Sequence, residues 1–505
     1  MRRLKPLVGA LILANAVSAG AAELPSEVIQ ALQHLQDRLA RLEARNADLE
    51  RRLAGADQCK ALEDRVKQLE TANARLEDAL STERISQAEP ELATRLKAVE
   101  FQALGMQKQA RMVEALEGIS AGVSLTSVAQ HANSGAAINA KAESQLSWRG
   151  DAQVSLPGGS LGQADGKLFF HFRMGQGDGL SGLNPSFSAP NATAFRLGGN
   201  PPDNASPILA QAWYQLDMPL PLDGVKARSR EHLEINFGKI DPFVFFDQNA
   251  AADDETAKFM NLAFVHNPLL DAGGGAGLDA YGFTPGIRLA YRNTPSKTSG
   301  WGVSLGVFGS GGGAAFNDSL KRPFAILQAE TRQKLFDGLS GNYRAYAWSN
   351  GRTTAFNNPV DATGEVRTGW GLSVDQRVAD SLLLWGRYGQ SGKGRVQFDR
   401  ALTLGAEITG NAWGRGADSL GLAYGWLRAA AAFKAQSATL DADADGNADF
   451  GWNASGAEQL AEVYYRWHFN KQFDLTPDYQ FIRRSGANSA AGDAHILGLR
   501  AQLTF

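Results

Sequence analysis

From about residue 147 onward, apolar and polar side chains alternate along the chain with a period of two. In the stretch LFFHFRMGQ (168–176), every second residue from Leu168 is apolar, and the intervening face carries His171 and Arg173. Such alternation is typical of a β-strand with one apolar face. Twelve segments show it clearly: 168–176, 210–218, 232–240, 286–293, 301–309, 342–350, 370–378, 382–390, 419–427, 460–469, 473–481 and 496–505. Four weaker segments show it less clearly: 147–156, 324–335, 400–409 and 431–440.

The length of these segments indicates that the apolar face points outward to lipid. Strands of about 9 to 11 residues are what a tilted strand needs to cross the hydrocarbon layer. Only a closed ring leaves no unpaired strand edge in lipid. Because even strand numbers prevail in bacterial barrels, we expect residues 147–505 to form an all-β transmembrane barrel of about sixteen antiparallel strands.

The last segment, ILGLRAQLTF (496–505), shows what closure requires. It must pair with the first strand, with Leu497, Leu499, Ala501, Leu503 and Phe505 facing lipid. Arg500 and Gln502 then face a water-filled lumen.

A different period precedes the barrel. Leucines between residues 27 and 84 are spaced alternately by three and four, as in the a/d seam of a coiled coil, with Asn46 and Asn73 at a-type positions. A weaker helical pattern continues to about 117, so we expect a coiled-coil or helical periplasmic segment over 27–117. The alternative is one amphipathic helix folded onto the body of the protein. Residues 118–146 are mostly small and polar, and we interpret them as a linker.

The first residues have the three parts of a secretory signal. A basic start is followed by the apolar run Leu7 to Val17 and by Ala19-Gly20-Ala21, which fits a cleavage site. We therefore expect a signal peptide over 1–22 and an exported protein; a buried N-terminal helix is the alternative. The single cysteine, Cys59, allows no intrachain disulfide, and the formal net charge of -3 gives no electrostatic reason to expect nucleic acid as a partner.

Several stretches of the barrel region resemble a known family. FFHFRMGQGDGL (169–180), INFGKIDPFVFFDQNAAADDETAKFMNLAFVHNPLLD (235–271), AYGFTPGIRLAYR (280–292) and LTPDYQFIRRSGANSAAGDAHILGLRAQLTF (475–505) look like the carbohydrate-selective porins (OprB type) of Gram-negative outer membranes. The resemblance implies a sixteen-stranded outer-membrane channel for glucose and other small sugars, usually trimeric. The coiled coil resembles the periplasmic extension of some porins. Phe505 resembles the assembly signal of outer-membrane proteins, although Arg500 stands where that signal usually has Gly.

The family-like stretches supply candidate pore-lining residues. A sugar-selective constriction needs hydrogen-bonding groups that replace water around hydroxyls, with weak binding and little net charge. The candidates from strands are Arg173, Glu234, Asn236, Arg288 and Arg292, with Lys239 and Asp241 at a strand end; Arg387, Glu462 and Arg466 line other strands. Those from the segment after 240, which we expect to fold inward, are Asp247, Asn249, Asp254, Glu255 and Asn261. For each, the alternative is a solvated residue that only balances charge.

One acidic stretch, DADADGNADF (441–450), matches part of a calcium-binding loop. Asp441, Asp443, Asp445, Asn447 and Asp449 fall at positions 1, 3, 5, 7 and 9, but Trp452 stands where the bidentate Glu belongs. The segment lies between two predicted strands, so it is either a calcium site or an acidic extracellular loop. We expect no other cofactor.

The sequence contains no recognisable catalytic constellation, and we expect no enzymatic activity. The seven histidines are scattered, without an H-E-x-x-H pair. The preferred hypothesis is passive diffusion of small sugars through the barrel. The alternatives are a coiled-coil tether between outer membrane and cell wall, and a pore that prefers anions or organic acids. The implied partners are outer-membrane lipid, small sugars, further copies of the chain in a trimer or dimer, and peptidoglycan.

Overall fold

The computed structural model describes most of the chain from residue 118 onward. The described ranges are 118–136, 142–180, 183, 186–197, 205–221, 229–270, 281–296, 298–310, 320–336, 338–358 and 365–505, with a few helical residues between 37 and 74. The predicted signal peptide (1–22) and nearly all of the predicted coiled-coil segment (27–117) lie outside the described residues. Both stay predictions.

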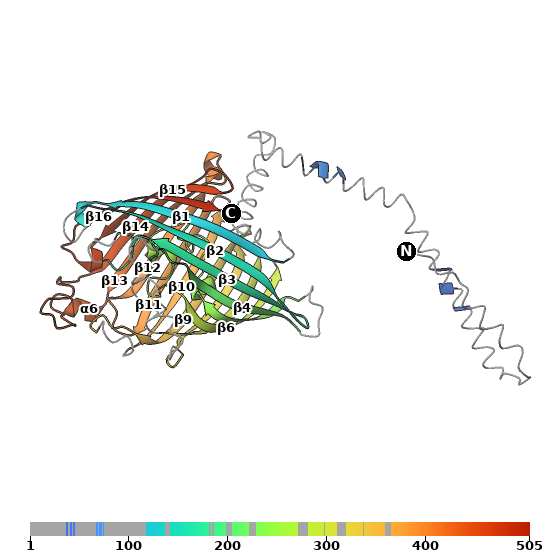
Figure 1. Cartoon of the computed structure of the whole chain (residues 1–505), viewed down its shortest axis with the longest axis horizontal. Helices are drawn as coiled ribbons and strands as arrows, with labels where there is room; N and C mark the ends of the chain where they lie inside the picture. Colours follow the sequence, from blue (N-terminus) through green and yellow to red (C-terminus); the bar gives the residue numbers. More distant parts are fainter. Residues whose placement is uncertain are drawn as a thin grey trace, which may run out of the picture. The chain divides into compact units, whose positions relative to one another are not determined.

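Sixteen antiparallel strands form a closed barrel in chain order, which confirms the predicted fold class (Figure 1). Each strand pairs with its neighbours in sequence, and the first pairs with the last, with Ser124–Ala132 opposite Thr504–Ile496. The strands are β1 (Ser120–Ala132), β2 (Glu143–Leu161), β3 (Ala164–Gln176), β4 (Ile208–Leu220), β5 (Glu231–Ile240), β6 (Thr284–Ser296), β7 (Ser299–Phe308), β8 (Phe324–Leu335), β9 (Leu339–Thr353), β10 (Glu365–Ala379), β11 (Leu382–Lys393), β12 (Phe398–Thr409), β13 (Ser419–Ala429), β14 (Ala457–His468), β15 (Phe473–Arg483) and β16 (Ala494–Thr504).

Two of the segment assignments made from the sequence are wrong. The predicted linker (118–146) contains β1 and the beginning of β2, so the barrel begins at Ser120 rather than near 147. The predicted strand 431–440 is instead the helix α6 (Ala431–Gln436) and a following turn, in the connection between β13 and β14. Small residues fill β1, but strand partners on both sides, β2 and β16, satisfy its backbone. The alanine-rich start of 431–440 favours a helix where no strand partner is available.

The wall has an apolar outer face, as the alternation predicted. In β16, Leu497 is 61% exposed and Leu499 46%, whereas Arg500 is 1% exposed. On the other strands, exposed apolar and aromatic side chains likewise occupy the outward-facing alternate positions. They are Phe172, Met174, Phe237, Ile287, Leu289, Val303, Leu305, Leu327, Trp370, Leu372, Leu384, Leu402, Leu404, Leu422, Tyr424, Val463 and Tyr479. Among the described residues, no helix is long and apolar enough to cross a membrane, a finding that concerns helices alone.

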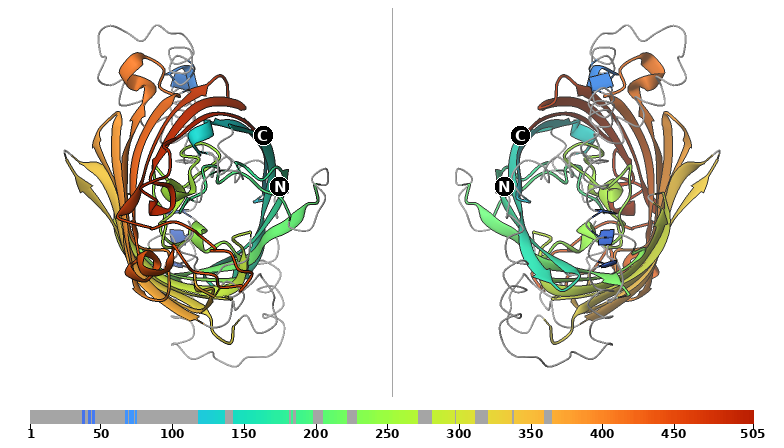
Figure 2. Two further views of the ribbon diagram at one scale, coloured as in Figure 1. Left: turned by 90° about the vertical axis from the view of Figure 1, so that its left-hand side faces the viewer. Right: turned by 90° about the vertical axis from the view of Figure 1, so that its right-hand side faces the viewer.

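The two ends of the barrel differ in the length of their connections. One end has tight turns such as 162–163 and 380–381, and it also holds the beginning of β1 and the end of β16. The other end carries the long connections, such as 177–207, 241–283 and 430–456. In outer-membrane barrels the short turns are periplasmic and the long loops extracellular. The view into the barrel shows that the segment after β5 lies inside the ring (Figure 2).

Candidate functional site: the pore constriction

Residues 241–270, which follow β5, form the main inward fold, and we call them the constriction segment. Its first turn, η3 (Pro242–Val244), is capped by Asp241, whose carboxylate accepts a hydrogen bond from the Phe243 amide. A short helix, α5 (Leu262–Val265), is capped in the same way by Asn261. These caps satisfy amides that would otherwise be unpaired where the segment leaves the wall.

A buried ion pair anchors the constriction segment to β11. The Arg387 guanidinium lies 3.2 Å from the Asp247 carboxylate, and neither side chain is exposed. Arg387 also donates to the carbonyls of Phe264 (2.9 Å), Asp247 (3.0 Å) and Ala252 (2.6 Å). The same carboxylate accepts from the Tyr346 hydroxyl (2.8 Å) and the Asn267 amide (2.6 Å). One arginine on the wall therefore fixes three points of the segment.

Three other strands of the barrel also form hydrogen bonds with the constriction segment. Glu462 of β14 accepts hydrogen bonds from the amides of Met260 (2.5 Å) and Asn261 (2.9 Å). Asn249 donates to the Ser373 hydroxyl and the Val374 carbonyl of β10. On β16, Arg500 donates to the carbonyls of Glu255 (2.9 Å) and Lys258 (2.7 Å). Because the anchors come from strands on different sides of the ring, the segment crosses the lumen.

A second inward stretch, residues 186–197, packs against the first. The Ala192 amide donates to the Met260 carbonyl (2.8 Å), and the Leu262 amide donates to the Ala189 carbonyl (2.9 Å). Glu458 of β14 holds its beginning, accepting from the Phe187 amide at 2.8 Å. Two connected segments thus narrow the same part of the barrel.

A cluster of charges, which we call the arginine cluster, joins β2 and β3 to the constriction segment: Arg149 and Asp151 of β2, His171 and Arg173 of β3, and Glu255. Asp151 accepts from Arg149 (2.8 Å), His171 (2.7 Å) and Arg173 (2.7 Å). Arg149 also reaches Glu255 of the constriction segment at 2.6 Å. Burial raises the pKa of the Glu255 carboxyl, but the charges of Arg149 and Arg173 outweigh this effect and hold that pKa below its usual range.

Aromatic rings flank the arginine cluster. The Arg173 guanidinium lies 5.3 Å from the centre of the Phe283 ring and 5.8 Å from that of Phe195. The Tyr281 ring lies 5.6 Å from Phe195. Guanidinium and carboxylate groups beside aromatic faces can meet both the hydroxyls and the apolar faces of a sugar ring.

A row of alternating charges, which we call the charge ladder, follows the wall from β5 to β10. Its ion pairs are Arg288–Glu234 (2.9 Å), Arg292–Glu234 (3.3 Å), Arg292–Glu330 (3.8 Å), Arg344–Glu330 (3.7 Å) and Arg344–Asp375 (3.2 Å). Each arginine of the ladder contacts at least one carboxylate. The ladder therefore presents many polar groups but little unbalanced charge.

Most of the predicted candidates fall into two groups. Arg173 (16% exposed), Glu234 (14%), Glu255 (20%) and Arg292 (35%) keep exposed surface on the inner side, and their pore-lining role stays a prediction. The buried candidates shape the passage by holding it together, without presenting a surface to it; they are Asn236, Asp247, Asn249, Asn261, Arg288, Arg387 and Glu462. Arg288, for example, is stacked 4.5 Å over the Phe245 ring of the constriction segment.

The remaining four candidates, two of them predicted at a strand end, differ from both groups. The Lys239 ammonium donates to the Leu209 carbonyl at 3.0 Å, and Asp241 caps a turn. Asp254 accepts from the amide of Thr256, and Arg466 donates to the Ala417 carbonyl. These four side chains have a local partner in the fold.

Sequence reasoning missed Arg149, Asp151 and the aromatic residues Phe195 and Phe283. Arg149 and Asp151 lie two residues apart on the inner face of β2. Charged residues at alternate positions of a predicted barrel strand were the available signal. The aromatic residues lie outside the strands, where no periodicity indicates their direction.

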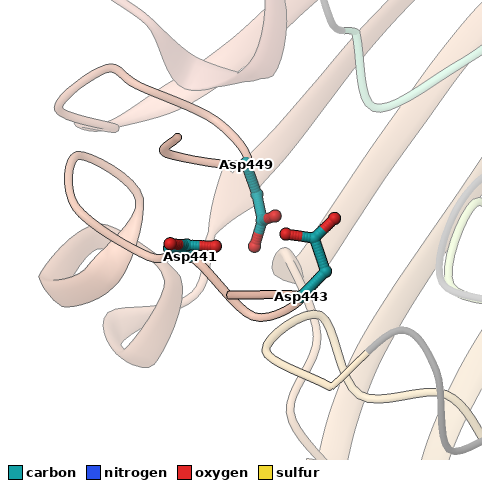
Figure 3. Close-up of side chains that lie close together, drawn as sticks. All are labelled: Asp441, Asp443 and Asp449. Carbon is teal, nitrogen blue, oxygen red and sulfur yellow. The ribbon is translucent and has the colours of Figure 1, made fainter. Parts of the chain in front are cut away.

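The acidic loop between β13 and β14 brings three of its five predicted ligands together. One carboxylate oxygen each from Asp441, Asp443 and Asp449 lies within 4.8 Å of the others (Figure 3). Asp441 accepts from the amides of Asp445 and Gly446, which already stabilise the turn. Trp452 donates to the Gly486 carbonyl. Calcium binding in this loop stays a prediction.

A solved structure and a family model agree with this architecture. A high-pH structure of OprB from Pseudomonas putida superimposes with a TM-score of 0.61 at 18% identity, over 77% of this chain and 94% of the other. The outer membrane channel DcaP of Acinetobacter baumannii gives a TM-score of 0.41 at 13% identity, over 77% and 97% of the two chains. No curated protein sequence matches the chain. The family described as "Carbohydrate-selective porin, OprB family" matches residues 87–505. The chain therefore belongs to the OprB family of carbohydrate-selective porins, and it is a protein of the Gram-negative outer membrane.

Proposed function

We propose that this outer-membrane porin is a passive channel that prefers small neutral carbohydrates. The observation that carries the proposal is the arginine cluster beside Phe283 and Phe195. Arg173 and Glu255 offer donors and acceptors to hydroxyl groups, and the rings offer apolar faces. Family membership supports the same solute class.

The pairing of the inner charges favours neutral solutes over anions. Arg149, Arg173, Arg288, Arg292, Arg344 and Arg387 each form at least one ion pair with a carboxylate. A guanidinium whose charge is already balanced attracts a passing anion weakly, yet its remaining N–H groups can still donate to a hydroxyl. We therefore do not favour a pore selective for anions or organic acids.

Proteoliposome swelling tests the proposal directly. Neutral monosaccharides should enter faster than neutral amino acids of similar size, and the reversal potential in a salt gradient should stay near zero. Equal entry of the sugar and the matched non-sugar would remove the carbohydrate preference and leave a general porin. A strongly anion-selective reversal potential would favour the organic-acid alternative.

The predicted tether and oligomer rest on other parts of the chain. Residues 27–117 lie almost entirely outside the described residues, so peptidoglycan binding and a trimer or dimer stay predictions. The channel proposal depends on neither.

A further inference from the structure

The outer face of the barrel carries a group of arginines on neighbouring strands, which we call the outer basic patch: Arg400 of β12, Arg428 of β13 and Arg483 of β15. Arg400 lies on the outward face of β12 together with the exposed Leu402 and Leu404. Arg428 lies on the outward face of β13 together with the exposed Leu422 and Tyr424. Arg483 is exposed and shares the parity of Tyr479. These cations therefore project from the same surface that contacts lipid.

The register places Arg400 and Arg428 side by side, and it places Arg483 two strands away from Arg428 and one step closer to the membrane. Arg400 lies directly opposite Arg428 across the β12–β13 pair. One step toward the membrane, Trp426 lies opposite Gln459, and Gln459 lies opposite Arg483. Strands are about 4.8 Å apart, so Arg483 lies roughly 10 Å across the sheet from Arg428.

Two like charges directly opposite each other destabilise a strand pair unless an anion lies between them. Asp399 balances only one of the two, since it forms a bidentate ion pair with Arg428 at 2.9 and 2.7 Å. Arg400 and Arg483 add two more positive charges, so the patch with Asp399 has a net charge of about +2. This arrangement suits an added anion with several oxygens, because guanidinium groups bind phosphate in a forked geometry.

Its position along the strands identifies the kind of anion. Arg400 is near the beginning of β12, and Arg428 and Arg483 are near the ends of β13 and β15, where the long connections begin. This is the extracellular boundary of the hydrocarbon layer. Directly below, Leu402 lies opposite Trp426, which marks the interfacial level at which lipid head groups begin.

We propose that the outer basic patch binds the phosphate groups of an outer-leaflet glycolipid, the lipid A part of lipopolysaccharide. The apolar wall below Leu402 and Trp426 contacts the acyl chains, and the three guanidiniums contact the phosphates. A head group with more than one phosphate can reach both Arg400 and Arg483. The site is on the outside of the barrel and is independent of the solute that passes through it.

Native mass spectrometry of the detergent-solubilised full chain tests the proposal with four probes: bisphosphorylated lipid A, the same lipid after phosphatase treatment, phosphatidylethanolamine and inorganic phosphate. The unmodified protein should retain lipid A and lose at least about tenfold in affinity for the dephosphorylated lipid. Equal retention of both lipids would overturn the proposal. Binding of inorganic phosphate as tight as that of lipid A would also overturn it, because the site would then recognise free phosphate.

A charge-matched pair of variants locates the site. The triple variant Arg400→Gln, Arg428→Gln, Arg483→Gln should lower lipid A affinity at least about tenfold. The control, Arg230→Gln, Arg332→Gln, Lys334→Gln, removes three exposed cations at the short-turn end and should bind as the unmodified protein does. An equal loss in both variants, or no loss in the first, would contradict the assignment. Retained channel formation in single-channel recordings shows that each barrel is folded, and if the triple variant fails to fold, the phosphatase comparison still decides.

Discussion

Removal of Arg387 tests whether the constriction segment is held by its buried anchor. In Arg387→Met the Asp247 carboxylate loses its charged partner, and the carbonyls of Phe264, Asp247 and Ala252 lose their donor. Breaking a buried ion pair costs about 3–5 kcal/mol. Water in the lumen can hydrate the carboxylate and some of the carbonyls that lose Arg387, so we expect a cost at the lower end of this range, about 3 kcal/mol. At about 1.4 kcal/mol per tenfold change, that is roughly a 100-fold larger population of the released segment.

Hydrogen exchange measured by mass spectrometry reports that population. The amides of Phe246, Lys258 and Leu270 form hydrogen bonds within the segment and should exchange roughly 100-fold faster in the variant. Single-channel recordings should show a larger and noisier conductance. In the double variant Arg387→Met, Asp247→Asn the loss should be smaller, because the uncompensated charge is removed.

Arg332→Met is the matched control, because Arg332 is exposed near the short turns and donates to Asn342 of β9. The reasoning is refuted if Arg387→Met forms a folded barrel whose segment exchanges at the rate of the unmodified protein. It is also refuted if the control accelerates exchange equally, since the effect would then be general destabilisation.

Four further predictions concern other groups. Phe283→Ala and Arg173→Gln should each reduce the entry of monosaccharides relative to a matched amino acid in proteoliposomes, because each removes part of the proposed sugar contact; an unchanged ratio would speak against that contact. The pKa of Glu255 is lowered, so its stabilising charge is present above the ordinary pKa of about 4.3 and is lost only as the pH falls through the lower folded value. Exchange in the constriction segment should therefore be faster in Glu255→Gln than in the unmodified protein, and the ratio of the two rates should be constant from about pH 7 to 5; a ratio that changes within that window would contradict the sign. Asp418 accepts from Arg415, the Tyr465 hydroxyl and the His468 amide, which together hold its pKa low against the opposing effect of burial. Asp418→Asn should lower the free energy of unfolding, measured in a thermal melt, by about 1.5–3 kcal/mol; an unchanged melt would show that these hydrogen bonds contribute nothing. Calorimetric titration of the purified protein with calcium should give heat that Asp441→Asn abolishes, and no heat in the unmodified protein would leave the loop as an acidic surface.

The strand pattern could be predicted because lipid outside and water inside enforce alternation along every strand. Leu497, Leu499 and Arg500 fall on the faces that the sequence predicted. The alternation is weakest in β1, where serine, alanine and glycine occupy most inner and outer positions, and its strand state depends on its partners β2 and β16. Pairing with β16, at the other end of the barrel sequence, leaves no local signal.

The candidate site could be predicted only as far as the face of each strand. Parity correctly placed Arg173, Glu234 and Arg288 on the inner side of the wall. It could not show that Phe245 of another segment would cover Arg288 and bury it, since that contact depends on where a long connection folds. Alternation therefore tells which side chains face inward, and the inward segments decide which of those stay in contact with water.

The contacts of β16 with the constriction segment have a consequence for the order of assembly. Arg500 and Gln502 lie on the strand that seals the ring, and they bind the backbone of Glu255 and Lys258 and the hydroxyl of Thr256. The last strand thus binds residues near the middle of the chain. The constriction segment must therefore already lie inside the barrel when β16 pairs with β1. If the barrel closed before the constriction segment entered it, the Arg500 guanidinium would lack these acceptors. Insertion of the constriction segment and closure of the barrel are therefore a single step.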